Sequence, residues 1–444
     1  MADANGHGVG SVQVTQNDQL SHCVDLFEGT KLERSVIRGK EVFFRPVNMS
    51  NEGPFEFQLP SQGNQYLQLG SFRLYGKTRI HHIDGDDLTK DEVGVINMFP
   101  ASLFEDITVT VNGVNVMESG SKAAHYKNYI ETILSYGRDA RDGWLSGAMF
   151  AMDDAGDFEI PYANAGWVKH LNRLKESRVF DWEMPVCDDF LRSDRVLPNG
   201  IDLKIVFHRS RTPFSLMGPK EKVEKEEYVI EFKELKLYAR MLEMDPSVAA
   251  YHQHGWNIQP YIYPINKTTI HHFLVPAGGS YCNIGPIFSK QLPKTVVVGM
   301  VDTKAFQGCA SMNPWNFQHF WCNKINLNVA TTIVPSEPYR PDFYKDLYAR
   351  EFSSLFQNTG LKISNEGNCI TRDHFAKGCF LMPFDLTADN CNGFHAHTPQ
   401  EGSLLVEIEF ATELKQSITV IVYSVFDSEL KISKNREATV SHVI

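Results

Sequence analysis

Short hydrophobic segments in which apolar and polar residues alternate recur along the whole chain, separated by Gly, Pro, Asn and Asp. Alternation with a period of two places successive side chains on opposite faces of a β-strand, and the separating residues are typical of turns. The segments that we expect to form strands are 41–47, 65–76, 106–116, 201–207, 228–242, 294–301, 324–334, 404–411 and 417–426. The pattern predicts an all-β protein.

Two segments instead have the 3.6-residue spacing of an amphipathic helix. The apolar stripe of the first consists of Tyr126, Tyr129, Ile130, Ile133 and Leu134 and ends before Gly137. The stripe of the second consists of Tyr344, Leu347, Tyr348, Phe352, Leu355 and Phe356 and ends before Gly360. Glycine is a common C-terminal stop of a helix. We interpret both stripes as core packing and not as a cofactor site.

Five short blocks occur in the same order in the two halves of the chain. They are a Phe-x-x-Pro string, a strand, a helix that opens with Tyr-Lys, a Met-Pro dipeptide and a strand that follows Gly. They lie at 57–60, 106–116, 126–127, 184–185 and 199–207, and again at 273–276, 324–334, 344–345, 382–383 and 401–410. The first half is longer before its Met-Pro dipeptide, which predicts an insertion within 147–175.

A half of this kind fits an eight-stranded jelly roll, in which two four-stranded sheets pack face to face. The repeat therefore predicts two tandem jelly-roll β-sandwiches, each with a helix inserted in a connection. We expect a flexible N-terminal arm over residues 1–30, the first jelly roll over 31–248, and the second, with a C-terminal tail, over 249–444. The polar segment 246–255 is the expected join.

Length and charge restrict the function. The 444 residues exceed one ordinary core, in agreement with two domains. The formal net charge is −11, and the first thirty residues contain no Lys or Arg, so no direct binding to nucleic acid is predicted. The eight cysteines form no Cys-x-x-Cys pair, and no run of eighteen apolar residues predicts a membrane span.

The one string that suggests a metal site is His395-x-His397-x3-Glu401. Residues at i and i+2 of a strand share a face, and two imidazoles with a carboxylate could bind a divalent metal, as in cupin enzymes. The glycines that flank this string in cupins are replaced by Asp389 and Ile408, and turn-forming residues surround it. We interpret the string as a polar loop, and a metal- or glycan-binding protein or enzyme that uses it remains the alternative.

Other polar clusters also have simpler explanations. The acidic segment 84–92 lacks the order of a calcium-binding loop and is expected to be a solvated hairpin. The pairs His81-His82 and His271-His272 are expected to place one ring each inward, in the core or at an interface. No nucleophile, phosphate-binding or metalloprotease motif is present. We therefore assign no catalytic, cofactor-binding or metal-binding residue and expect no enzyme.

The chain resembles the double jelly-roll major capsid proteins, or hexons, of Polinton or Maverick elements, adintoviruses and adomavirus-like DNA viruses. The segments that carry the resemblance in the first half are 64–88, 96–116 and 125–137, and those in the second half are 329–356, 367–387 and 402–436. Their hydrophobic and turn residues lie in the same order from Val42 to Arg436.

The resemblance implies a structural protein of the virion that is made and assembled inside a host cell. It implies homotrimeric, pseudo-hexagonal capsomers that contact each other, penton or vertex proteins and minor capsid proteins in an icosahedral shell. It implies no cofactor.

Overall fold

The computed structural model describes residues 32–60, 65–88, 93–116, 123–224, 227–361, 367–389 and 396–442. The arm expected over residues 1–30 lies outside these ranges.

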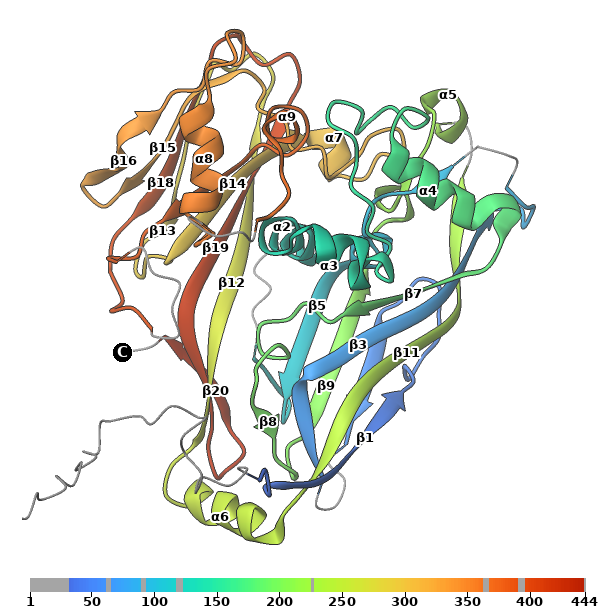
Figure 1. Ribbon diagram of the computed structural model, residues 1–444, viewed down its shortest axis with the longest axis vertical. Helices are drawn as coiled ribbons and strands as arrows, with labels where there is room; N and C mark the ends of the chain where they lie inside the picture. Colours follow the sequence, from blue (N-terminus) through green and yellow to red (C-terminus); the bar gives the residue numbers. More distant parts are fainter. Residues whose placement is uncertain are drawn as a thin grey trace, which may run out of the picture.

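Two sheets form the first half of the molecule, on the right in Figure 1. All their ladders are antiparallel. One sheet has the order β1 (Val36–Phe44), β11 (Tyr228–Met244), β3 (Gln65–His82), β7 (Phe180–Pro185), with β8 (Val196–Leu197) beside β3. The other has the order β2 (Phe55–Leu59), β9 (Leu203–Arg209), β5 (Phe104–Val111), β6 (Val114–Asn115), and β4 (Gly94–Val95) with β10 (Leu216–Met217) form a separate ribbon.

The second half repeats this strand order (Figure 1). Its first sheet is β12 (Tyr261–Val275), β19 (Ile418–Ile432), β14 (Thr295–Asp302), β17 (Leu381–Asp385), with β20 (Ala438–His442) beside β19. Its second sheet is β13 (Tyr281–Phe288), β18 (Leu404–Phe410), β15 (Cys322–Val329), β16 (Thr332–Tyr339). The double jelly roll predicted from the sequence is confirmed.

Alternating burial explains most of these strands. Leu404, Val406, Ile408 and Phe410 of β18 are buried, whereas the residues between them are partly exposed. The first half of β19 differs because every residue from Ile418 to Ser424 is buried. One face of β19 lies in its own sandwich and the other lies against the first jelly roll.

The two predicted helices occupy equivalent connections, between β6 and β7 in the first sandwich and between β16 and β17 in the second. They are α2 (Ala124–Ser135) and α8 (Ala349–Gln357). The expected start of the second helix is wrong by five residues, and Tyr344 and Leu347 are exposed. The backbones of Asp342 and Leu347 close a turn, and the Asp342 carboxylate accepts hydrogen bonds from the amides of Tyr344 and Lys345. Such local hydrogen bonds compete with a helix.

Further helices occur where the sequence predicted only connections. Within the expected insertion lies α4 (Ala165–Leu174). The others are α1 (Phe99–Ser102), α3 (Arg138–Asp142), α5 (Lys220–Val223), α7 (Thr303–Phe306) and α9 (Arg372–Ala376).

The predicted polar join between the jelly rolls is a helix, α6 (Pro246–Trp256), at the bottom of Figure 1. The Asp245 carboxylate accepts a hydrogen bond from the Ser247 amide, 2.9 Å away, and Pro246 occupies the first turn, where its missing N–H is not needed. We propose this helix as the boundary between two domains, near the predicted division at residues 248 and 249.

Two of the five repeat blocks are wrong: Tyr344-Lys345 precedes α8 and does not open it, and the Phe-x-x-Pro strings end strands that are not equivalent. The first Phe-x-x-Pro string ends β2, whereas the second ends β12, which occupies the position of β1. The Met-Pro block is correct, because the two copies lie in equivalent strands, β7 and β17, each at the end of the first sheet of its sandwich. Pro185 pairs with Arg73 and Pro383 pairs with Val297.

The register of the Met-Pro blocks extends across both sheets. In the first jelly roll, paired residues on the four adjacent strands are Phe43, Tyr238, Arg73 and Pro185. The equivalent paired residues in the second are Ile270, Tyr423, Val297 and Pro383.

Candidate functional site: the junction between the jelly rolls

Helix α2 lies between the two sandwiches and has almost no exposed surface (Figure 1). Its Tyr126 hydroxyl donates a hydrogen bond to the carbonyl of Pro314, 3.1 Å away. Its Tyr129 ring stacks on Trp315, with ring centroids 4.5 Å apart and an interplanar angle of 3°. The Trp315 indole N–H donates to the carbonyl of Asn97, at 2.8 Å. The apolar stripe of α2 therefore packs on the second jelly roll as well as on its own.

Other aromatic side chains from both jelly rolls complete this core. Tyr126 stacks on Phe306 and contacts Phe214 and Phe317 edge-on. His125 is buried against Phe214, and burial lowers the pKa of its ring to about 3. The ring is therefore neutral at physiological pH and behaves as part of the aromatic cluster.

Charged side chains lie beside the aromatic cluster. Lys127 forms an ion pair with Asp189, and Arg192 forms one with Glu131. The second jelly roll binds both acids: the Tyr423 hydroxyl donates to Glu131 at 3.1 Å, and the Thr268 amide donates to Asp189 at 2.7 Å.

Burial opposes the charges in this cluster, but the ion pairs outweigh it at two positions. Burial alone would lower the pKa of the Lys127 amine, yet the carboxylates of Asp189 and Glu131 raise it. Burial would raise the pKa of Glu131, yet Arg192 and Lys127 lower it. Both groups therefore stay charged, and removing one partner would leave a buried charge uncompensated.

The insertion in the first half adds a third set of contacts. Amide nitrogens of Asn313 and Asn316 donate to the Phe158 carbonyl at 3.2 Å and to Glu159 at 3.0 Å. The Phe158 ring lies against Gly378, where an added Cβ would come within 2.2 Å of the ring. Gly378 also has a φ of +129°, which side-chain-bearing residues rarely adopt. The insertion therefore joins the two jelly rolls.

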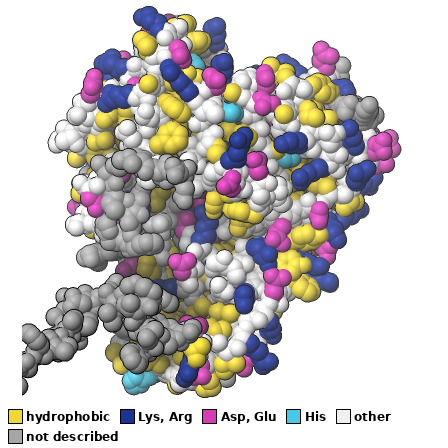
Figure 2. Space-filling model, in the orientation of Figure 1, with side chains coloured by type: hydrophobic (Ala, Val, Ile, Leu, Met, Phe, Trp, Pro, Cys, Tyr) yellow, Lys and Arg dark blue, Asp and Glu magenta, His cyan; other side chains and the backbone are white. Residues whose placement is uncertain are grey.

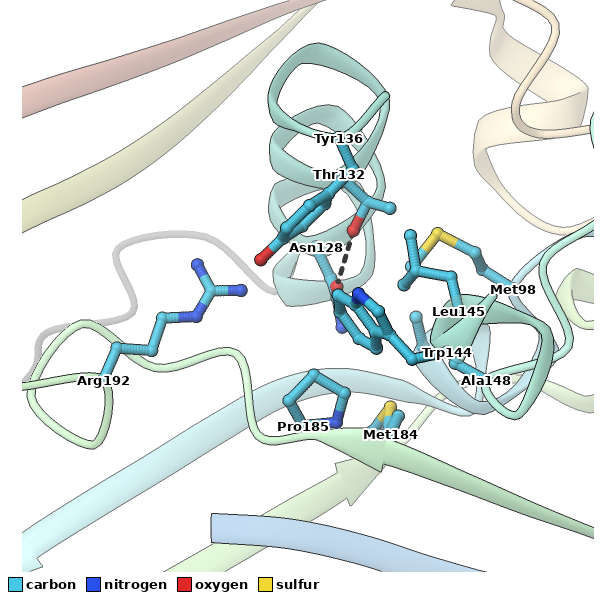
Figure 3. A pocket seen from close by; sticks show the side chains of 11 residues that line it. Met98, Asn128, Thr132, Tyr136, Trp144, Leu145, Ala148, Met184, Pro185 and Arg192 are labelled. Carbon is cyan, nitrogen blue, oxygen red and sulfur yellow. Dashed lines mark hydrogen bonds between the residues drawn. The ribbon is translucent and has the colours of Figure 1, made fainter. Parts of the chain in front are cut away.

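The cavities at the junction differ in size. One, between α2 and the end of β7, is lined by Asn128, Thr132 and Met184 among others and holds only about 10 Å³ (Figure 3). Such a volume fits about one water molecule and no organic ligand. A larger cleft of about 850 Å³ separates the sandwiches beside the charged cluster, and its lining includes Arg195 and Lys294.

A second cleft, of about 660 Å³, lies outside the junction core. Its lining includes Arg138, Arg141, Lys169 and Arg173 together with Asp142, Asp153 and Asp154. Burial raises the pKa of Asp153 to about 7. Opposite charges in this cleft are mixed.

The predicted metal string is not assembled as a site among the described residues. His395 lies outside them, and Glu401 is exposed and bridges backbone-to-backbone with Gln291. The two ring nitrogens of His397 face different carboxylates, Asp427 at 3.3 Å and Asp389 at 3.0 Å. Within the described ranges, no group of three His, Cys, Asp or Glu side chains is arranged to hold a metal ion.

The paired histidines pack in ways that need no ligand role. His81 is half-buried and lies 3.8 Å from Glu231. His271 packs edge-on against Phe288, and His272 lies against Phe306 at the margin of the junction. In the acidic segment 84–92, residues 89–92 lie outside the described ranges and Asp87 pairs with Arg79.

The surface carries both signs of charge. Over the first jelly roll, Lys and Arg are interspersed with Asp and Glu on the face drawn in Figure 2. On the outer face of β1, β11, β3 and β7, Arg73 pairs with Glu41 and Glu183, and Glu234 pairs with Lys77 and Lys236. Among the described residues, no helix has the length and apolarity needed to cross a membrane.

No protein-family model matches the chain. The sequence is 22% identical over 422 residues to an uncharacterized protein of Caenorhabditis elegans, F54H12.2, a match that spans 90% of this chain and 96% of that one.

Solved structures share the fold. A chain of the Sputnik virophage cryo-EM structure has a TM-score of 0.58 and 13% sequence identity, over 98% of this chain and 94% of that one. The mavirus major capsid protein has a TM-score of 0.53 and 11% identity, over 99% of this chain and 97% of its own. The chain therefore has the double jelly-roll fold found in viral major capsid proteins.

Proposed function

We propose that this chain is a major capsid protein that forms homotrimeric, pseudo-hexagonal capsomers of an icosahedral DNA-virus shell. The observation that carries the proposal is the full-length likeness to the mavirus major capsid protein, which covers 99% of this chain and 97% of that one. A likeness of this extent includes both sandwiches and their junction.

The chemistry of the junction supports a structural role and not an enzymatic one. Its polar groups are engaged in structural contacts: Tyr126 and Trp315 donate to backbone carbonyls across the junction, Tyr423 and the Thr268 amide donate across it to Glu131 and Asp189, and Lys127 and Arg192 pair with these two acids within the first jelly roll. The cavity beneath α2 is too small for a substrate. We assign no catalytic, cofactor-binding or metal-binding residue.

The proposed partners are other copies of this chain, penton or vertex proteins and minor capsid proteins, in a virion assembled in a host cell. The net charge of −11 and the interspersed charges in Figure 2 support a shell that encloses its genome without binding nucleic acid directly.

A second candidate function is a trimer that builds no shell. The nematode relative favours it, because a chain that is 22% identical to this one, over 90% of its length, occurs in an animal. Such a protein would retain the jelly rolls and the trimer but not the contacts between trimers.

Electron microscopy tests the proposal. The purified protein, alone and co-expressed with its vertex and minor proteins, is imaged after negative staining. Pseudo-hexagonal particles that build closed shells are the expected result. Trimers that form no shell under any of these conditions would favour the second candidate, and dispersed monomers would contradict both.

A further inference from the structure

The two jelly rolls differ at the outer face of their first sheets. This face is covered in the second jelly roll (β12, β19, β14, β17) and open in the first (β1, β11, β3, β7). In the second jelly roll, Ile270, Tyr423 and Val297 point out of the sandwich towards the first and are buried. Their register equivalents in the first jelly roll are Phe43, Tyr238 and Arg73. Phe43 is 50% exposed.

Each jelly roll has an equivalent helix, α2 or α8, and within the chain only α2 packs on the outer sheet face of the other jelly roll. Helix α2 covers the second jelly roll and is itself buried. Its equivalent, α8, is preceded by a turn that is open to solvent, in which Tyr344 is 63% exposed and Leu347 62%, and the first residues of α8, Ala349 and Arg350, are exposed as well. Tyr126 in the first turn of α2, by contrast, is fully buried at the junction.

Within one chain, α2 of the first jelly roll covers the outer sheet face of the second. The outer sheet face of the first jelly roll and the surface around α8 of the second therefore remain open. The open faces belong to different jelly rolls, so they cannot pair within one chain without breaking the junction. A second copy can supply the missing half of each. Such a contact is heterologous, since different surfaces of the two copies meet, and heterologous contacts close into rings when the rotation allows.

We propose that the aromatic face of the first jelly roll, formed by Phe43, Tyr75 and Tyr238, packs against the turn and helix 342–357 of the next copy. This contact repeats between chains the packing of α2 on the second jelly roll within a chain. This contact depends on the proposed homotrimer and specifies the two surfaces that would form it.

The aromatic face has the composition of an interface centre. Phe43 lies on Tyr238 with ring centroids 6.1 Å apart, and Tyr75 meets Tyr238 edge-on at 6.3 Å. The Lys236 amine lies 5.2 Å from the Phe43 ring centroid, and the Arg73 guanidinium lies 5.9 Å from that of Tyr238. Aromatic residues and Arg are enriched at interface centres.

Most of the charges around the aromatic face are paired within the chain. Arg73 lies between Glu41 and Glu183, and Lys77 and Lys236 flank Glu234, while the Arg45 guanidinium lies 5.9 Å from the Phe43 ring centroid. A partner that covers Tyr75 and Tyr238 therefore needs to supply no counter-charge to the paired groups. The surrounding ion pairs suit a polar rim.

The opposite surface presents apolar groups of matching chemistry. The Trp321 indole stacks on the Tyr344 ring with centroids 4.1 Å apart and an interplanar angle of 12°. Phe320 and Trp321 both have left-handed backbone conformations, with φ of 45° and 59°. Bulky residues rarely adopt them, so the fold holds the indole at the surface against a local preference. Leu347 lies on the same turn.

Charge substitution in both surfaces tests the contact. Phe43→Glu and Tyr344→Glu each place a carboxylate in the proposed interface, and Ile258→Glu changes another exposed apolar residue (74%) that lies beyond α6 and outside the proposed interface. By size-exclusion chromatography with light scattering, we expect wild type and Ile258→Glu as trimers and both other variants as monomers. Circular dichroism should give all four the same spectrum, since each substituted side chain is exposed.

Cross-linking gives a second readout that does not depend on a variant losing its assembly. A chain with both Phe43→Cys and Tyr344→Cys, treated with a short bismaleimide, should give linked dimers and trimers on a denaturing gel. Each single-cysteine variant reports the background from native thiols such as Cys369.

Trimers that survive both charge substitutions, with no cross-link above the single-cysteine background, would overturn the assigned surfaces and leave the trimer standing. A monomeric wild type would instead contradict the proposed homotrimer, and with it this contact.

Discussion

Replacing Trp315 with Ala tests whether the junction holds the jelly rolls together. The side chain is fully buried, stacks on Tyr129 and donates a hydrogen bond of 2.8 Å to the Asn97 carbonyl. Truncating a buried Trp costs about 3–5 kcal/mol, and a buried carbonyl left without a donor adds about 1–3 kcal/mol. We expect the free energy of unfolding to fall by about 4–8 kcal/mol.

Urea titration followed by far-ultraviolet circular dichroism measures this loss without depending on tryptophan fluorescence. Trp315→Phe keeps a ring on Tyr129 but loses the hydrogen bond and part of the buried ring, so we expect a loss smaller than that of Trp315→Ala and no less than about 1–3 kcal/mol, the cost of leaving the buried carbonyl without a donor. Trp144→Ala removes an indole that is 49% exposed and should change the free energy by about 1 kcal/mol or less. If Trp315→Ala cost no more than Trp144→Ala, the junction would not be the stabilising contact that we describe.

Three further predictions concern the charged groups. Lys127→Met leaves the Asp189 carboxylate buried without its cation, so the free energy of unfolding should fall by about 3–5 kcal/mol, whereas adding Asp189→Asn should recover most of it; an unchanged urea midpoint for Lys127→Met would contradict this. Burial raises the pKa of Asp153 to about 7, so the folded protein favours the protonated carboxyl. The stability that this protonated carboxyl contributes is fully present below about pH 4. It is lost as the pH rises to about 7, because the unfolded chain ionises first. Asp153→Asn should therefore flatten the decline in melting temperature between pH 4 and pH 7, and an unaltered pH profile would refute the assignment. His395→Ala with His397→Ala should leave the trimer mass unchanged, whereas loss of a bound metal together with an activity would establish the metal-binding alternative.

Alternating apolar residues were sufficient to predict most strands, because in strands such as β18 one face enters the core and the other does not. The repeat is predictable where residues of the two halves lie at equivalent positions of equivalent strands, as at Met184-Pro185 and Met382-Pro383. The Phe-x-x-Pro block failed because a short apolar string before a proline ends many strands. Sequence spacing alone did not distinguish β2 from β12.

The junction was largely invisible in the sequence. Trp315 lies in a connection without periodicity, and its partner Asn97 precedes it by more than two hundred residues. The apolar stripe of α2 predicts core packing but does not show that the helix packs on both jelly rolls. Similarly, Tyr344 and Leu347 fit a helical period and yet lie in a turn, because the Asp342 carboxylate binds the amides that a helix would use.

Native mass spectrometry of the purified protein tests the central claim most directly, because one spectrum reports both stoichiometry and bound metal. The account predicts a metal-free homotrimer of about 151 kDa, three times the 50.3 kDa chain. A monomer of 50.3 kDa that carries a stoichiometric transition metal would contradict it.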